Sequence, residues 1–83
     1  MKVTDEITDE RTRKYLMVWV DENGEKRGLE HFKGKKSQLP ETIVVVGSDV
    51  QKVCKLEQVK MVNDSPWAVY RFSWRSYRKW FVM

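Results

Sequence analysis

Residues that build catalytic and metal sites are scarce in this 83-residue chain, which holds one cysteine and one histidine. Cys54 is the single cysteine and cannot close an intramolecular disulfide, which favours the interior of the cell as the compartment. Its apolar neighbours Val53 and Leu56 predict that its side chain is a small buried hydrophobic group. A dyad of His31 and Cys54 would need a third group and a shaped cleft, which a chain this short rarely provides. The spacing of His31, Cys54 and the acidic residues along the chain also matches no characteristic set of metal ligands. We therefore expect a protein without catalysis, metal or cofactor.

Long apolar runs are also missing. No basic start leads into an apolar run at the N-terminus, and nowhere do roughly 18 apolar residues follow one another. We expect neither a secretory signal nor a membrane span, and hence a cytoplasmic protein. The glycines near lysines in ENGEKRG and FKGKKS lack the order of a phosphate loop, so they predict turns. Motifs of the common RNA-binding modules are absent too.

The length bounds the domain organisation, because a chain this short buries only about 60 to 65% of its unfolded surface. Four Trp, three Tyr and three Phe supply large buried area per residue, so one small core is feasible. We expect a single β-rich domain over residues 12–83. Residues 1–11 predict a flexible acidic arm, since they hold four acids and few aliphatic side chains.

Charge is distributed unevenly along the chain. Residues 1–10 hold four acids against Lys2, a balance of −3 (1 − 4), and the rest holds fifteen Lys and Arg against eight acids, a balance of +7 (15 − 8). From Ser65 onward there are four cations and no acid. This asymmetry favours a polyanionic or acidic partner for the body of the domain.

Several segments predict strands joined by turns. RKYLMVWV, residues 13–20, is apolar on both faces and predicts a central strand covered on two sides. The Asn23-Gly24 pair predicts a hairpin, with a return strand over residues 25–32 and Gly28 as a possible bulge. TIVVV, residues 42–46, predicts a short buried strand.

Residues 48–62 are ambiguous. Ser48 and Gln51 fit a capping box that would start a helix at about Asp49. From Leu56 to Val62 the apolar residues fit neither the helical nor the strand period. We expect a two-turn helix running into a strand, with a strand as the alternative.

A turn at NDSP, residues 63–66, precedes the last apolar segment, which alternates. Tyr70, Phe72 and Trp74 are expected to face the core, with Arg71 and Arg75 outward beside Trp67 and Val69. Together the segments predict a β-rich fold, all-β or α+β: a small antiparallel sheet or partly closed barrel of five or six strands with one or two short helices.

The closing stretch YRFSWRSYRKWFVM carries four cations, six aromatic side chains and no acid. Cations attract phosphates, and accessible rings stack on unpaired bases. We expect RNA or single-stranded nucleic acid as the partner. The predicted phosphate contacts are Lys33, Lys35, Lys36, Arg71, Arg75, Arg78 and Lys79, and the predicted stacking rings are Tyr77 and Trp80.

Protein recognition is the alternative hypothesis, because Trp, Tyr and Arg are also the residues that most often anchor protein interfaces. In size and style the chain resembles the small accessory proteins of phages. In this reading it binds and inhibits a host protein, such as a nucleic-acid-handling enzyme or a toxin, through the same surface. A homodimer is a further option, because residues 15–20 are apolar on both faces.

Overall fold

The computed structural model describes residues 4–46, 50–73 and 78–79 and confirms a β-rich fold. Among these residues, helix is confined to one 3-10 turn, η1, at Lys36–Gln38. The strands in chain order are β1 (Thr4–Asp5), β2 (Arg13–Val20), β3 (Lys26–Gly34), β4 (Thr42–Val46), β5 (Val50–Val62), β6 (Ser65–Phe72) and β7 (Arg78–Lys79).

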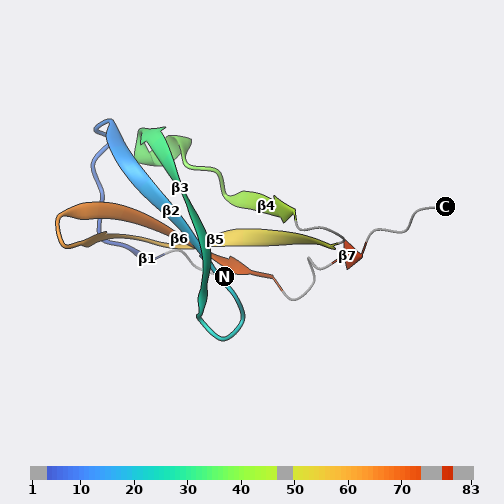
Figure 1. Ribbon diagram of the computed structural model, residues 1–83. Helices are drawn as coiled ribbons and strands as arrows, with labels where there is room; N and C mark the ends of the chain where they lie inside the picture. Colours follow the sequence, from blue (N-terminus) through green and yellow to red (C-terminus); the bar gives the residue numbers. More distant parts are fainter. Residues whose placement is uncertain (1–3, 47–49, 74–77, 80–83) are drawn as a thin grey trace.

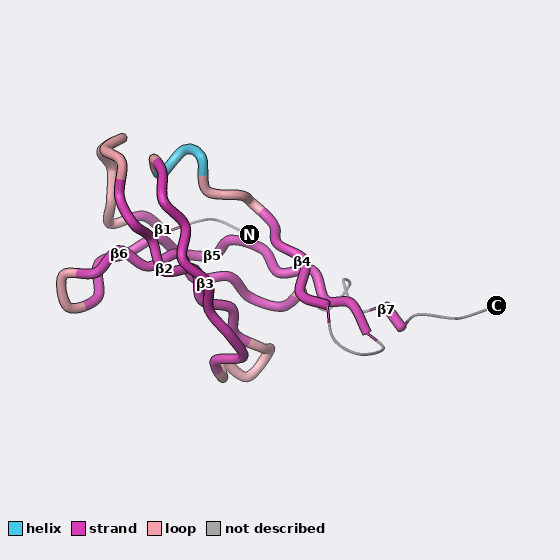
Figure 2. Tube along the Cα trace, turned by 45° about the horizontal axis from the view of Figure 1, so that its top comes forward, coloured by secondary structure: helices cyan, strands magenta, loops and turns pink. Residues whose placement is uncertain are grey.

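All seven strands of the described ranges belong to one sheet that curls into a half-barrel (Figures 1 and 2). β5 pairs with β6 and β7 along one edge, and with β4 and β1 along the other. β2 then lies between β6 and β3. The expected antiparallel sheet is in fact mixed, because β6 runs parallel to β2 and β1 runs parallel to β5.

The predicted central strand is confirmed as β2. Tyr15 and Met17 are buried on one side of it, while Val18 and Val20 are buried on the other. The chain then turns back into β3. At the bulge beside Trp19, Gly28 is required by close approach, since a Cβ there would lie 2.6 Å from atoms of the Trp19 indole.

The two tightest turns use positive φ at different positions. In the predicted hairpin only Gly24 adopts it, at 82°, and its N–H donates to the Asp21 carbonyl at 2.9 Å. Glycine has no Cβ, so this conformation costs it little. Between β5 and β6, Asn63 and Asp64 both adopt it, at 50° and 68°. Short polar side chains tolerate this conformation, so the predicted turn is confirmed at residues 63 and 64. Ser65 and Pro66, which were predicted to lie in the turn, already belong to β6.

The expected helix after Ser48 is wrong, because β5 is a strand for 13 residues. Its register shifts between Leu56 and Gln58, which leaves Glu57 as an extra residue. The core-facing positions therefore change from Cys54 and Leu56 before the bulge to Val59 after it. This bulge explains why the apolar residues of the segment follow no single period.

One face of the sheet builds the core. Tyr70 is fully buried and Phe72 packs against the same cluster, so the predicted inward face of β6 is confirmed for these two residues. Burial raises the pKa of the Cys54 thiol to about 11, which agrees with the predicted buried position of this side chain. The buried members of the core are Ile7, Tyr15, Met17, Leu39, Cys54, Val59, Ala68 and Tyr70.

Part of the expected flexible arm packs against the body of the domain. β1 pairs with β5, and the Glu6 N–H donates to the Val59 carbonyl at 2.9 Å. Ile7 is buried in the core. A single aliphatic side chain among acids gave no local signal of this docking, because its partner strand lies far along the chain.

Candidate nucleic-acid interface

The face of the sheet turned away from the core, here called the outer face, carries lysines around a tryptophan. Side chains alternate along β2, so Leu16 lies on the outer face because Tyr15 and Met17 lie in the core. Leu16 pairs with His31 of β3 on one side and with Trp67 of β6 on the other.

Two rows of side chains result from this register. Trp67 in turn pairs with Lys60 of β5, so the first row runs His31, Leu16, Trp67 and Lys60 across four strands. In the second row Lys14 of β2 pairs with Lys33 of β3. Paired residues in neighbouring strands share a face of the sheet. Five polar or aromatic side chains therefore lie near one another on the outer face: Lys14, His31, Lys33, Lys60 and Trp67.

The two rows carry positively charged side chains and no negatively charged ones. Lys14, Lys33 and His31 are exposed, while Lys60 and Trp67 are half-buried. Neither row contains an acid, and the next row, formed by Leu29, Val18, Val69 and Gln58, contains none either. A face with three lysines and no carboxylate in these rows attracts anions.

The predicted lysine loop adjoins this face. Lys33 belongs to the second row, and β3 ends one residue later at Gly34. Lys35 follows and is exposed, and Lys36 begins η1 half-buried. The backbone N–H of Lys35 donates to the Gln38 side chain at 2.8 Å, which fixes the path of the loop. Two further cations thus follow directly on the end of β3 that carries Lys33.

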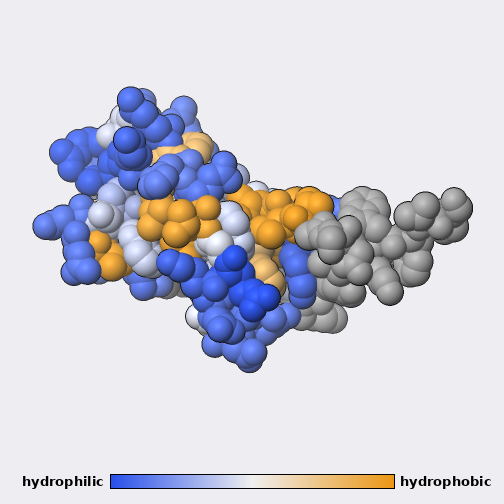
Figure 3. Space-filling view, in the orientation of Figure 1, coloured by the Kyte–Doolittle hydropathy of each residue, from blue (hydrophilic) through white to orange (hydrophobic). Residues whose placement is uncertain are grey.

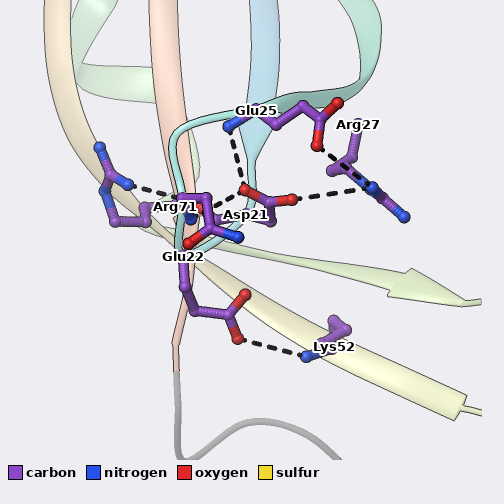
Figure 4. A network of polar contacts seen from close by, with 7 residues as sticks. Asp21, Glu22, Glu25, Arg27, Lys52 and Arg71 are labelled. Carbon is purple, nitrogen blue, oxygen red and sulfur yellow. Dashed lines mark hydrogen bonds and ion pairs between the residues drawn. The ribbon is translucent and has the colours of Figure 1, made fainter.

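Arg71 is held within the protein by two contacts. Its Nε donates to Glu57 at 2.7 Å. Its Nη1 donates to the Asp21 carbonyl at 3.1 Å (Figure 4). The hydrogen bond to Glu57 also raises the pKa of the guanidinium. The side chain thus ties β6 to the bulge of β5 and to the β2–β3 turn. Contact with a phosphate would have to compete with the Glu57 carboxylate.

Asp21 organises the same turn. Its Oδ1 accepts the backbone N–H groups of Asn23 and Glu25, both at 2.9 Å. Its Oδ2 lies 3.7 Å from Arg27, and nearby Glu22 lies 3.6 Å from Lys52 (Figure 4). The Glu25 N–H is the largest cause of the lowered pKa of the Asp21 carboxyl.

We expect this carboxylate to make stability depend on acid pH. Because the pKa of Asp21 is lowered in the folded state, its contribution is present above the ordinary value of 3.8 and is lost as the pH falls below that value. Asp21→Asn is therefore expected to lose less free energy of unfolding on acidification than the wild type. Urea denaturation at pH 7 and at about pH 3 measures this difference. Equal losses in both proteins would contradict it.

The remaining predicted contacts fall largely outside the described residues. Arg75, Tyr77 and Trp80 lie there, as does Trp74. Arg78 and Lys79 form β7, whose backbone pairs with Gln51 and Val50 at the far end of β5. Their places in the predicted surface stay predictions.

His31 and Cys54 lie on opposite faces of the sheet. His31 is exposed on the outer face whereas Cys54 is buried in the core, so the two do not form a dyad. No group of three or more His, Cys, Asp or Glu side chains that could hold a metal ion occurs among residues 4–46, 50–73 and 78–79. In the same part of the chain, no helix is long and apolar enough to cross a membrane.

Comparison with protein-family models, with curated proteins and with solved structures found no match. The geometry of the chain itself therefore carries the functional argument.

Sequence reasoning missed three members of the outer-face rows. Lys14 and Lys60 lie outside the basic C-terminal segment, and no local pattern marks His31 as part of a binding face. The prediction that Trp67 shares a face with Arg71 agrees with the alternation of side chains along β6. What the sequence did not show was the register that sets Trp67 between Leu16 and Lys60.

Proposed function

We propose that this protein is a binding module without catalysis, whose outer face binds RNA or single-stranded DNA. The observation that carries the proposal is the acid-free pair of rows, in which Trp67 lies among Lys14, Lys33 and Lys60. Lysines on a sheet face can contact phosphates, while an indole in the same face can stack on a base.

Single strands suit this face better than duplexes. Neighbouring strands lie roughly 5 Å apart, so Lys60 is one strand spacing from Trp67. A base stacked on the indole would place its own backbone within reach of a lysine. The bases of a duplex are already stacked on one another and cannot offer a face to the ring. The binding mode therefore requires unpaired bases.

A salt titration of the wild-type protein tests this proposal. If three lysines contact phosphates, log K against log salt should fall with a slope of about −2, at roughly −0.7 per contact for a single strand. Fluorescence anisotropy of a labelled mixed-sequence RNA of about ten nucleotides measures K at several salt concentrations. A dissociation constant weaker than about 100 μM at low salt, or a flat slope, would contradict phosphate binding.

Recognition of another protein is the second candidate, favoured by the apolar part of the same face. In the row next to the two outer-face rows, Leu29 is 45% exposed, Val69 is half-buried and Val18 is buried. Phosphates and bases do not require the exposed Leu29 side chain, whereas an apolar partner surface would cover it. Capture from a lysate before and after nuclease treatment separates the candidates, because a protein partner is retained after treatment.

A further inference from the structure

The edge of β4 that faces away from β5 has the features of a pairing edge. The Leu56 N–H donates to the Glu41 carbonyl at 2.8 Å, which fixes the hydrogen-bonding alternation between the two strands. Residues 41, 43 and 45 therefore direct their backbone groups toward β5. The N–H and C=O groups of Thr42, Val44 and Val46 point to the opposite side. In the described chain β4 pairs with β5 alone.

The side chains of this edge are apolar and accessible. Val44 is 51% exposed and Val46 is 66% exposed, and both lie on the same face of β4. In Figure 3 apolar surface gathers over β4, to the right of centre. The predicted strand at residues 42–46 is thus confirmed, but its predicted burial is wrong, because the strand lies at the edge of the sheet rather than inside it.

The other long edge of the sheet is protected. β3 carries Lys26, Arg27, Glu30 and Lys33 along its length. Charged side chains on an edge strand oppose pairing with a further strand. β4 has no charge from residue 42 to residue 46. An uncharged, apolar edge of five residues is one that another strand can extend.

We propose that two copies of this chain associate by antiparallel pairing of their β4 strands about a two-fold axis at Val44. In this register Val44 pairs with Val44 of the second copy, and Val46 pairs with Thr42. The outward backbone groups of all three residues are then satisfied reciprocally. No charge meets its own copy, because the strand has none. On the outer face Val44 and Val46 gain apolar neighbours from the second copy. On the core face Ile43 and Val45 do the same.

The oligomeric state in solution is the first test. Sedimentation equilibrium at about 100 μM is expected to give twice the 10.0 kDa mass of one chain. Val44→Lys places two ammonium groups together at the axis and is expected to give a monomer. Leu29→Lys is the matched control, since Leu29 is 45% exposed on β3, and it should stay dimeric. A monomeric wild type would overturn the proposal and leave the edge open to a strand of another protein.

Cross-linking tests the register without relying on a destabilising change. In the proposed dimer the two Cα atoms at position 44 lie about 5.5 Å apart, within disulfide range. The two at position 46 lie roughly 13 Å apart, because four residues separate position 46 from its opposite, position 42. Val44→Cys should therefore oxidise to a covalent dimer at least tenfold faster than Val46→Cys. The buried Cys54 thiol contributes little background.

The exposed fractions of Val44 and Val46 make the comparison of cross-linking rates more decisive. Val46 is the more exposed, so random collision would favour the cross-link at position 46. Equal rates, or a faster reaction of Val46→Cys, would overturn the register. β4 contributes no residue to the two outer-face rows. A failed dimer test therefore does not contradict nucleic-acid binding, and a failed RNA titration does not contradict the dimer.

Discussion

Trp67→Ala is expected to weaken the binding of a single-stranded RNA about 5- to 150-fold. The loss corresponds to one base–aromatic stack, roughly 1 to 3 kcal/mol. Trp67 is half-buried on the outer face and contributes nothing to the buried core cluster, so the domain should remain folded. Trp67→Phe keeps an aromatic face and should recover most of the affinity. Anisotropy titrations of the three proteins under one salt condition measure the effect.

The stacking role fails if Trp67→Ala is folded and binds as tightly as the wild type. Arg71 supplies a second comparison, because its guanidinium is bonded to Glu57 and to the Asp21 carbonyl. Arg71→Ala is accordingly expected to lower the free energy of unfolding with a smaller effect on RNA affinity than Trp67→Ala. If Arg71→Ala instead weakens RNA binding more than Trp67→Ala, the interface lies nearer the C-terminal segment than proposed.

Tyr70→Ala is expected to cost about 3 to 5 kcal/mol of the free energy of unfolding, as for other large core side chains. Tyr70 is fully buried, and its hydroxyl donates to the Pro40 carbonyl at 2.7 Å. Burial raises the pKa of this hydroxyl to about 12, so it stays protonated and keeps donating at neutral pH. Domains of this size have a total stability of roughly 4 to 12 kcal/mol. The variant should therefore lose at least about a quarter of this stability, and all of it at the lower end of the range.

The hydrogen bond and the packing can be separated with two phenylalanine variants. Tyr70→Phe is expected to cost about 1 kcal/mol, because it leaves the Pro40 carbonyl without this donor. Tyr15→Phe is the matched control: Tyr15 is equally buried, but its hydroxyl has no hydrogen-bond partner among the described residues. Its removal should be neutral or stabilising. Urea denaturation decides, and equal costs for the two variants would contradict this assignment.

Local pattern predicted most of the secondary structure. The run of residues 13–20 that is apolar on both faces, the Asn23-Gly24 turn and the TIVVV segment each predicted an element that the structure contains. The bulge at Glu57 defeated the same method, because one extra residue inverts the pattern within a single strand. A capping-box match at Ser48 then favoured a helix that the pairing of β5 on both edges overrides.

The candidate interface was less accessible to sequence reasoning. It depends on Leu16 lying beside Trp67, and these residues belong to strands that are far apart in the chain and pair in parallel. No local period encodes such a register. The charge count did indicate a basic surface, and Lys33 was identified. The C-terminal cations drew attention by their density, yet Arg71 among them is bound to Glu57.

The most direct test of the outer-face interface is an NMR titration of the two described tryptophan indoles with single-stranded RNA. Trp67 lies on the outer face, whereas Trp19 lies against Gly28 and packs on the core. The indole N–H resonance of Trp67 is predicted to shift in proportion to bound RNA while that of Trp19 stays in place. An unchanged Trp67 resonance at saturating RNA would contradict the account.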